Sequence, residues 1–207
     1  MLRKLATDWS LWVLIIFNLY LLDYYQKHPG EIGTLIFLYW AQSVLIGVVN
    51  FFDLLTVRHI KPGSMKMNNQ PVEDSARGKG CVALFFLVHY GIFHLVYMVF
   101  VLVENFRTIN FHFVLIGVAI LGVQLVGDFI RRKINQDDKP VNIGKMFFLP
   151  YARIVPMHFM ILLPKFIHLD NFTVFIILKI VMDLLMHFVL SSHYRNGSST
   201  ASLPSEL

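Results

Sequence analysis

Long apolar runs constrain this chain more than any other feature. Six of them follow one another along its 207 residues, each bounded by polar residues. They lie near residues 9 to 27, 32 to 57, 81 to 103, 109 to 130, 147 to 168 and 171 to 192. A helix of about 20 mainly apolar residues crosses the hydrocarbon core of a bilayer. The runs therefore predict an all-α, polytopic membrane protein with about six transmembrane helices.

The composition agrees with this class, because 56% of the residues are hydrophobic and only 15% are charged. Such values exclude an ordinary soluble domain. We expect one transmembrane domain over residues 1 to 193 and a disordered cytoplasmic tail over residues 194 to 207. The first run has a basic start like a signal peptide, but it holds Asn18 and Asp23 and no small-residue cleavage site follows it. It is therefore expected to be a retained helix.

The basic residues predict the orientation of the helices. Most of the 18 Lys and Arg precede the first run, follow the second, fourth or sixth run, or lie close to those ends. The opposite side holds only Lys27, Arg107 and Lys165. By the positive-inside rule, both termini face the cytoplasm. The net charge of +5 then reflects topology and attraction to anionic lipids at the cytoplasmic face. The expected partner is the lipid bilayer, and nucleic acid need not be invoked.

The loops carry no recognisable catalytic motif. The longest, KPGSMKMNNQPVEDSARGKG at residues 61 to 80, is rich in Pro, Gly, Asn and Lys and is expected to be a mobile connection. The chain contains no Walker loop and no GxGxxG, HExxH or CxxC motif. Its single cysteine, Cys81, excludes an internal disulfide. Any chemistry is therefore expected inside the membrane.

Ionisable residues inside the runs are candidates for a functional site, because inserting a charged group into a bilayer costs about 2.5–3.5 kcal/mol. Depth can be counted from the cytoplasmic ends at about 1.5 Å per residue. His89 then lies about 12 Å deep, and His158 and Asp183 lie about 15 Å deep. His187 lies about 9 Å from the same face. Four residues from three helices thus share one layer of the membrane.

Three histidines and a carboxylate form a ligand set for a divalent transition metal such as zinc. Asp183 and His187 are spaced i, i+4 and so lie on one face of their helix. Pro156 is expected to kink the helix just before His158. The sequence therefore predicts a metal site made of His89, His158, Asp183 and His187, with His89 pointing toward the other three.

Three more polar residues are expected around this cluster. Asn50 and Tyr90 are candidates to hydrogen-bond the ligands. Arg153 lies about 8 Å deep on the fifth run, where it can pair with Asp183 or, if a haem is bound, with a propionate. We therefore assign Arg153, Asn50 and Tyr90 to cofactor binding.

Three other interpretations of the histidines stay open. Each histidine can hydrogen-bond across helices and only hold the bundle together. Two facing histidines can hold a haem, and Asp183 with the histidines can carry protons or ions.

His94 points about 140° away from His89 around the helix. It is expected to join Tyr90 and Tyr97 in a hydrogen-bonded aromatic stripe.

Four blocks stand out: YWAQSVLIGVVN at residues 39 to 50, FFLVHYGIFHLVYMVFV at 85 to 101, PYARIVPMHFMILL at 150 to 163 and KIVMDLLMHFVLSSH at 179 to 193. They resemble a family of small bacterial membrane proteins known as domain of unknown function 6498. The resemblance extends over nearly the whole chain, and HYGxF and PYxR are its most specific parts. It singles out Tyr39, Trp40, Gly47, Asn50, His89, Tyr90, Gly91, Phe93, Pro150, Tyr151, Arg153, His158, Lys179, Asp183 and His187. Gln42 stands where the family tends to have an acidic residue, which argues against a mechanism that needs a carboxylate there.

These observations predict a multi-pass protein of the bacterial inner membrane whose polar centre binds a divalent metal. If the metal keeps an open position, its bound water can be activated to hydrolyse a lipid or peptide bond. No serine, cysteine or free glutamate is expected beside the cluster, so the catalytic residues are unknown and enzyme status is not assigned. The alternative is a non-enzymatic membrane scaffold or binding protein. Association into a homo-oligomer is left open.

Overall fold

A computed structural model of the chain describes residues 9–134, 140–155 and 180–181. Within these residues the chain is mainly helical, which confirms the predicted helical class. The helices are α2 (Trp9–Lys27), α3 (Ile32–Thr56), α4 (Ala76–Asn105), α5 (Phe111–Ile134) and α6 (Ile143–Phe148), with 3-10 turns η1 (Phe106–Thr108) and η2 (Leu149–Arg153) and strands β1 (Lys66–Met67) and β2 (Gln70–Pro71). Three described helices, namely α3, α4 with η1, and α5, are long and apolar enough to cross a membrane.

The chain divides into two units, one of residues 28–157 and one of residues 1–27 with 158–207. In the second of these, α2 forms over the range that the first apolar run predicts. Asp23 and Lys27 form an exposed ion pair on α2, with 2.7 Å between Oδ2 and Nζ. Residues His158, Asp183 and His187 also belong to this unit but lie outside the described residues.

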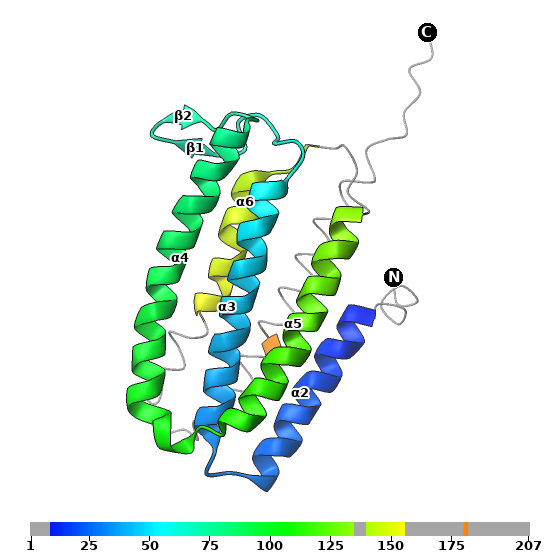
Figure 1. Cartoon of the computed structure of the whole chain (residues 1–207), viewed down its shortest axis with the longest axis vertical. Coiled ribbons are helices and arrows are strands. Elements are labelled where there is room, and N and C mark those ends of the chain that lie inside the picture. Colours follow the sequence, from blue (N-terminus) through cyan, green and yellow to red (C-terminus); the bar gives the residue numbers. More distant parts are fainter. Residues whose placement is uncertain (1–8, 135–139, 156–179, 182–207) are drawn as a thin grey trace. The chain divides into compact units, whose positions relative to one another are not determined.

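In the unit of residues 28–157, α3 lies between α4 and α5 and packs against both (Figure 1). Small residues allow both contacts. Gly47 of α3 lies against the ring of Tyr90 on α4, and Gly117 of α5 lies against Leu38 of α3. A Cβ at Gly117 would lie 2.8 Å from Leu38 Cδ1, so only glycine fits without a shift. These helices therefore approach closely, as is common for membrane helices with small residues at their contacts.

Apolar side chains cover the outward faces of α4 and α5. Ile92 and Leu95 on α4 expose 57% and 59% of their surface, and Leu115 and Val123 on α5 expose 67% and 77%. Soluble monomers rarely expose contiguous apolar surface of this extent. The exposed faces thus agree with the length and hydropathy of these helices in suggesting a membrane protein.

The connection between α3 and α4 contains a two-stranded hairpin, β1 with β2, within the loop that the sequence predicts over residues 61 to 80, and the mobility of that loop stays a prediction. Asn68 and Asn69 between strands β1 and β2 have positive φ angles of 50° and 62°. Two positive φ angles are what a two-residue hairpin turn requires, and asparagine tolerates them. Ser75 caps α4 by accepting a hydrogen bond from the Gly78 amide at 3.1 Å, so α4 begins at Ala76 and not near residue 81.

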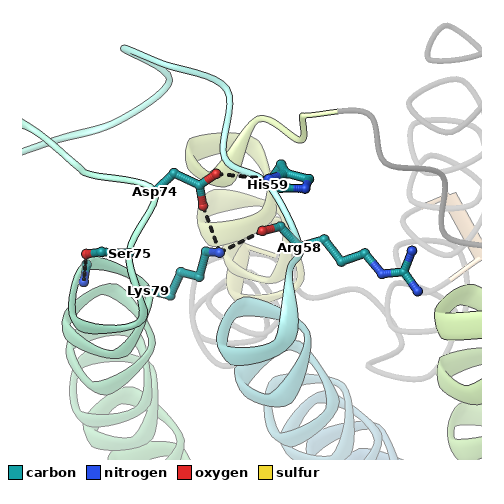
Figure 2. Close-up of polar contacts among 6 residues, drawn as sticks. Arg58, His59, Asp74, Ser75 and Lys79 are labelled. Atoms are coloured by element: carbon teal, nitrogen blue, oxygen red, sulfur yellow. Dashed lines mark hydrogen bonds and ion pairs between the residues drawn. The ribbon is translucent and has the colours of Figure 1, made fainter.

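A charged cluster fastens this hairpin to the start of α4 (Figure 2). Asp74 lies between Lys79 and His59, at 2.7 Å from Lys79 Nζ and 3.3 Å from His59 Nδ1. Lys79 also donates to the carbonyl of Arg58 at the end of α3. These contacts join the residues that follow α3 to the first turn of α4.

The cluster predicts that the hairpin loosens in acid. The hydrogen bond from Lys79 is the main reason that the pKa of Asp74 lies below its ordinary value, and His59 and the Ile60 amide act in the same direction against the opposing effect of burial. A lowered pKa in the folded state stabilises the fold above about pH 4, and this contribution is lost as the pH falls through the lowered value. Hydrogen exchange should show falling protection factors for hairpin amides below pH 4. Asp74→Asn should show weak protection at every pH, and unchanged wild-type protection at pH 3 would contradict the role of Asp74.

The fifth apolar run begins differently from the prediction. The helix α6 starts at Ile143, before residue 147, where Asn142 caps it by accepting from the Lys145 amide at 2.9 Å. At Leu149 the chain tightens into η2, which has Pro150 near its start. Proline has no amide hydrogen to donate and is well tolerated at such a position. This short turn carries Tyr151 toward α4, and the rest of the run, including Pro156, lies outside the described residues.

Candidate intramembrane polar site

His89 on α4 is the predicted metal ligand that the structure describes. Its Nδ1 lies 2.8 Å from the hydroxyl of Tyr151, which η2 brings to this face of α4. The His89 ring also stacks on Phe85 with 5.5 Å between centroids and meets Phe93 edge-on at 5.2 Å. These contacts fix the orientation of the imidazole. Among the described residues nothing hydrogen-bonds to Nε2.

Tyr90, the next residue on α4, points elsewhere. Its hydroxyl lies 2.9 Å from Ser43 Oγ on α3 and donates to the Ser43 carbonyl at 3.1 Å. Its ring stacks on Phe86 at 4.9 Å and meets Tyr151 edge-on at 5.4 Å. The ring of Tyr90 therefore separates the Tyr151 side of the site from the Ser43 side, while its hydroxyl serves the Ser43 side.

His94 lies at the centre of a buried hydrogen-bond network that joins α3 to α4. Its Nδ1 lies 2.9 Å from the Tyr90 carbonyl, and its Nε2 lies 2.9 Å from Ser43 Oγ. Trp40 Nε1 donates to the carbonyl of His94 at 2.9 Å. The predicted stripe is confirmed, since the His94 ring stacks on Tyr90 at 4.1 Å and meets Tyr97 at 6.4 Å, and all three residues are buried.

Ser43 is the residue that sequence reasoning missed. It is fully buried and contacts both Tyr90 and His94. A signal for it exists in the sequence, because Ser43 and Gly47 are two small residues four apart on an apolar helix. That spacing marks the side of a membrane helix that packs closely against another. Depth along a helix, the quantity used in the sequence analysis, does not reveal which side chains face one another.

Two amide side chains of α3, Gln42 and Asn50, each have one buried polar atom without a hydrogen-bond partner among the described residues. Gln42 exposes 7% of its surface, and its Oε1 has no hydrogen-bond partner among the described residues. The Asn50 Nδ2 is likewise buried and has no partner within the described part of the chain. Helical geometry puts both between the side that contacts α4 through Gly47 and the side that contacts α5 through Leu38. A buried polar atom without a partner costs about 1–3 kcal/mol, so this face is suited to a bound water, ion or polar ligand.

Arg153 ends the η2 turn that carries Tyr151, so its backbone lies beside the predicted site, but its side chain is outside the described part of the chain. His158, Asp183 and His187 lie wholly outside the described part of the chain. Within residues 9–134, 140–155 and 180–181 there is no group of three or more His, Cys, Asp or Glu that would hold a metal. The four-ligand site therefore stays a prediction.

A second polar contact ties α3 to α5 near the ends of both helices. Asp53 exposes 8% of its surface and binds Arg132 Nη2 at 2.8 Å and Lys133 Nζ at 3.1 Å. Lys133 also lies over the ring of Phe129, 5.3 Å from its centroid. One carboxylate thus neutralises two cations at the basic end of α5.

Comparison with known proteins gives one match. A family model described as a family of unknown function, DUF6498, matches residues 1–202. No curated protein matches the chain, and no solved structure does. The match confirms the resemblance seen in the sequence blocks, while its description assigns no activity. A function has to be argued from the site itself.

Proposed function

Because the chain belongs to the DUF6498 family, which has no assigned activity, we propose its function from the site: an integral membrane protein that binds a divalent transition metal, such as zinc, at a polar centre inside the membrane. The single observation that carries this is the environment of His89. Metal-bound histidines usually engage their second ring nitrogen in a hydrogen bond that fixes the ring. Tyr151 engages His89 Nδ1 in this way and leaves Nε2 for the metal.

The proposed topology has about six spans, with both termini cytoplasmic, in the bacterial inner membrane. The distribution of Lys and Arg supports it by the positive-inside rule. Arg58 and Lys61 follow α3, and the Arg131 to Lys133 run closes α5. Asp53, near the end of α3, binds two residues of that run, so these basic groups gather where α3 and α5 end. This end would face the anionic lipids of the cytoplasmic leaflet.

The remaining ligands would be His158, Asp183 and His187, which the sequence assigns and which lie outside the described residues. Three imidazoles and one carboxylate suit zinc. Bound there, the metal would supply an activated water for hydrolysis. The role of His89 is to hold one coordination position, and the role of Tyr151 is to fix the His89 ring. Arg153 and Asn50 keep their proposed place around the ligands, whereas the Tyr90 hydroxyl is engaged at Ser43.

Metal content tests the proposal. Full-length protein purified in detergent should hold about one zinc-type ion per chain by mass spectrometry of metals. His89→Ala should lose most of it, and Tyr151→Phe should weaken metal affinity by about 10–100-fold. His112→Ala is the matched control, because His112 is an exposed histidine at the start of α5 and its removal should change nothing. Equal or negligible metal in wild type and His89→Ala would overturn the proposal, and a Soret band would assign the histidines to haem.

A structural role is the competing function, and one observation favours it. Ser43, Tyr90 and His94 satisfy one another across the contact of α3 with α4. Membrane helices use such hydrogen bonds to hold their packing. In this case the protein would be a scaffold that binds partners or further copies of itself through the apolar faces of α4 and α5. Loss of bundle stability in His94 variants, together with negligible metal in the wild type, would be its signature.

A further inference from the structure

The hydrogen bonds of Ser43 match those of an activated serine nucleophile. Such a serine has a histidine within about 2.6–3.2 Å as its base, and a third group orients that histidine. His94 Nε2 lies 2.9 Å from Ser43 Oγ, and the Tyr90 carbonyl lies 2.9 Å from His94 Nδ1. We propose that Ser43 is a nucleophile, with His94 as its general base, and that its substrate is an acyl ester that approaches from the bilayer. This proposal stands independently of the metal centre.

The partners of His94 fix the direction of its hydrogen bonds. A carbonyl oxygen only accepts, so Nδ1 must carry the proton that is shared with Tyr90. In the neutral ring, Nε2 is then the acceptor, and the proton between it and Ser43 comes from the serine hydroxyl. A serine that donates to an imidazole nitrogen is poised to lose that proton.

Tyr90 adds a donor at the same oxygen. Since the Ser43 proton is directed to His94, only the Tyr90 proton can serve the 2.9 Å contact between the two hydroxyl oxygens, and Tyr90 shares that one proton between Ser43 Oγ and the Ser43 carbonyl. Its position is held by stacking on Phe86 and by the second contact with the Ser43 carbonyl. A fixed donor beside the nucleophile stabilises negative charge on oxygen during attack, and its effect is largest where water is excluded.

Gly91 is an open, exposed position of α4 close to this buried pair in the sequence. Ser43 exposes 0% of its surface and His94 exposes 4%. Gly91 precedes His94 by less than one turn of α4, is exposed, and has no atom within 4 Å of the place where a Cβ would lie. The neighbouring positions Ile92 and Leu95 carry large side chains that are exposed on the apolar side. The surroundings of Gly91 are therefore open and apolar, and a substrate that approaches the pair from this side of α4 would be a bilayer-soluble ester.

The reaction balances with water as the second reactant. Ser43 Oγ forms a bond to the ester carbonyl carbon while its proton passes to His94 Nε2. The carbon–oxygen bond to the alcohol then breaks, and His94 returns the proton to the leaving alkoxide. Water attacks the acyl-serine, gives its proton to His94 and releases the carboxylic acid, and the serine oxygen regains the proton.

A hydrophobic alkyl fluorophosphonate tests the proposal without a known substrate. Ser43 should attack phosphorus, release fluoride and pass its proton to His94, leaving an adduct that mass spectrometry locates at Ser43. Full-length wild type should be labelled in detergent and in phospholipid vesicles, and Ser43→Ala should not be. His94→Gln keeps a side chain that hydrogen-bonds but lacks the base, and it should be labelled at least about 100-fold more slowly. Ser64 and Ser75 serve as internal controls that should stay unlabelled.

Two further variants test the path, and a chelator separates this proposal from the metal centre. Gly91→Leu should slow labelling at least about tenfold, because its side chain fills the open space at this position of α4. Gly122→Leu fills an equally open position of α5 and should not slow labelling. Treatment with EDTA removes a bound metal and should leave the labelling of Ser43 unchanged. Failure of the metal centre and failure of the Ser43 nucleophile are therefore recognised separately. Absence of a Ser43 adduct in wild type, or equal rates in wild type and a folded His94→Gln protein, would overturn the nucleophile. Equal rates in wild type and Gly91→Leu would overturn the path.

Discussion

Valine in place of Gly47 is expected to force α3 and α4 apart and to lower the free energy of unfolding by about 2–4 kcal/mol. A Cβ at this position would lie 2.8 Å from Cδ1 of the Tyr90 ring and would overlap Cε1. The ring cannot turn aside, because it stacks on Phe86 and His94 and its hydroxyl is bound at Ser43. The helices must therefore separate, and the hydrogen bonds at Ser43 lengthen with them. Thermal unfolding in detergent, followed by circular dichroism, measures the loss.

The same substitution at a glycine with open surroundings is the matched control for Gly47→Val. Gly91→Val adds the same side chain on α4 where no atom lies within 4 Å, so its effect should stay within about 0.5 kcal/mol. A double variant locates the cause: with Tyr90→Ala in the background, Gly47→Val should cost much less, because the side chain it strikes has been removed. Equal losses for Gly47→Val in both backgrounds would show that the contact with Tyr90 is not the reason.

The helices could be predicted from the sequence because a membrane span is defined by length and apolarity alone. The run at residues 9 to 27 is α2, and the run at residues 32 to 57 differs from α3 only at its end. The same reasoning gave the wrong start for α4, because Ser75 caps the helix through a hydrogen bond that hydropathy does not register. Helix boundaries set by polar caps therefore escape a hydropathy argument.

The pairing of side chains across helices was beyond the sequence for a different reason. Depth places His89 and His94 along α4, but the partner of each depends on how the helices are rotated and where loops return. Tyr151 reaches His89 because α6 ends in a tight turn at Leu149. Ser43 reaches His94 because Gly47 lets α3 approach the Tyr90 ring. Both pairings depend on contacts between residues far apart in the sequence, and the residue that seemed the weaker candidate, His94, is the one with the fuller set of described partners.

Replacing Asp53 by alanine is expected to destabilise the contact of α3 with α5 by about 2–3 kcal/mol. The Asp53 side chain is 11% exposed and binds both Arg132 and Lys133, so its loss leaves two cations side by side without a counter-charge. Removing one partner of a buried ion pair costs about 3–5 kcal/mol. The cost here should be smaller, because the side chains of Arg132 and Lys133 are 29% and 24% exposed and water screens them in part. Unfolding of the detergent-solubilised protein measures the effect.

An exposed ion pair within the same chain is the control for the Asp53→Ala result. Asp23 binds Lys27 on α2 at the same 2.7 to 2.8 Å as Asp53 binds Arg132, but 54% of the Asp23 side chain and 67% of the Lys27 side chain are exposed. Asp23→Ala should therefore cost less than about 1 kcal/mol, and 1 M salt should remove most of that, since screening then acts over about 3 Å. Asp53→Ala should keep most of its effect in 1 M salt, because burial shields the carboxylate from ions. Equal losses at the two positions would mean that burial does not strengthen the Asp53 pair, and the basic end of α5 would then have to be held by apolar packing against α3 alone.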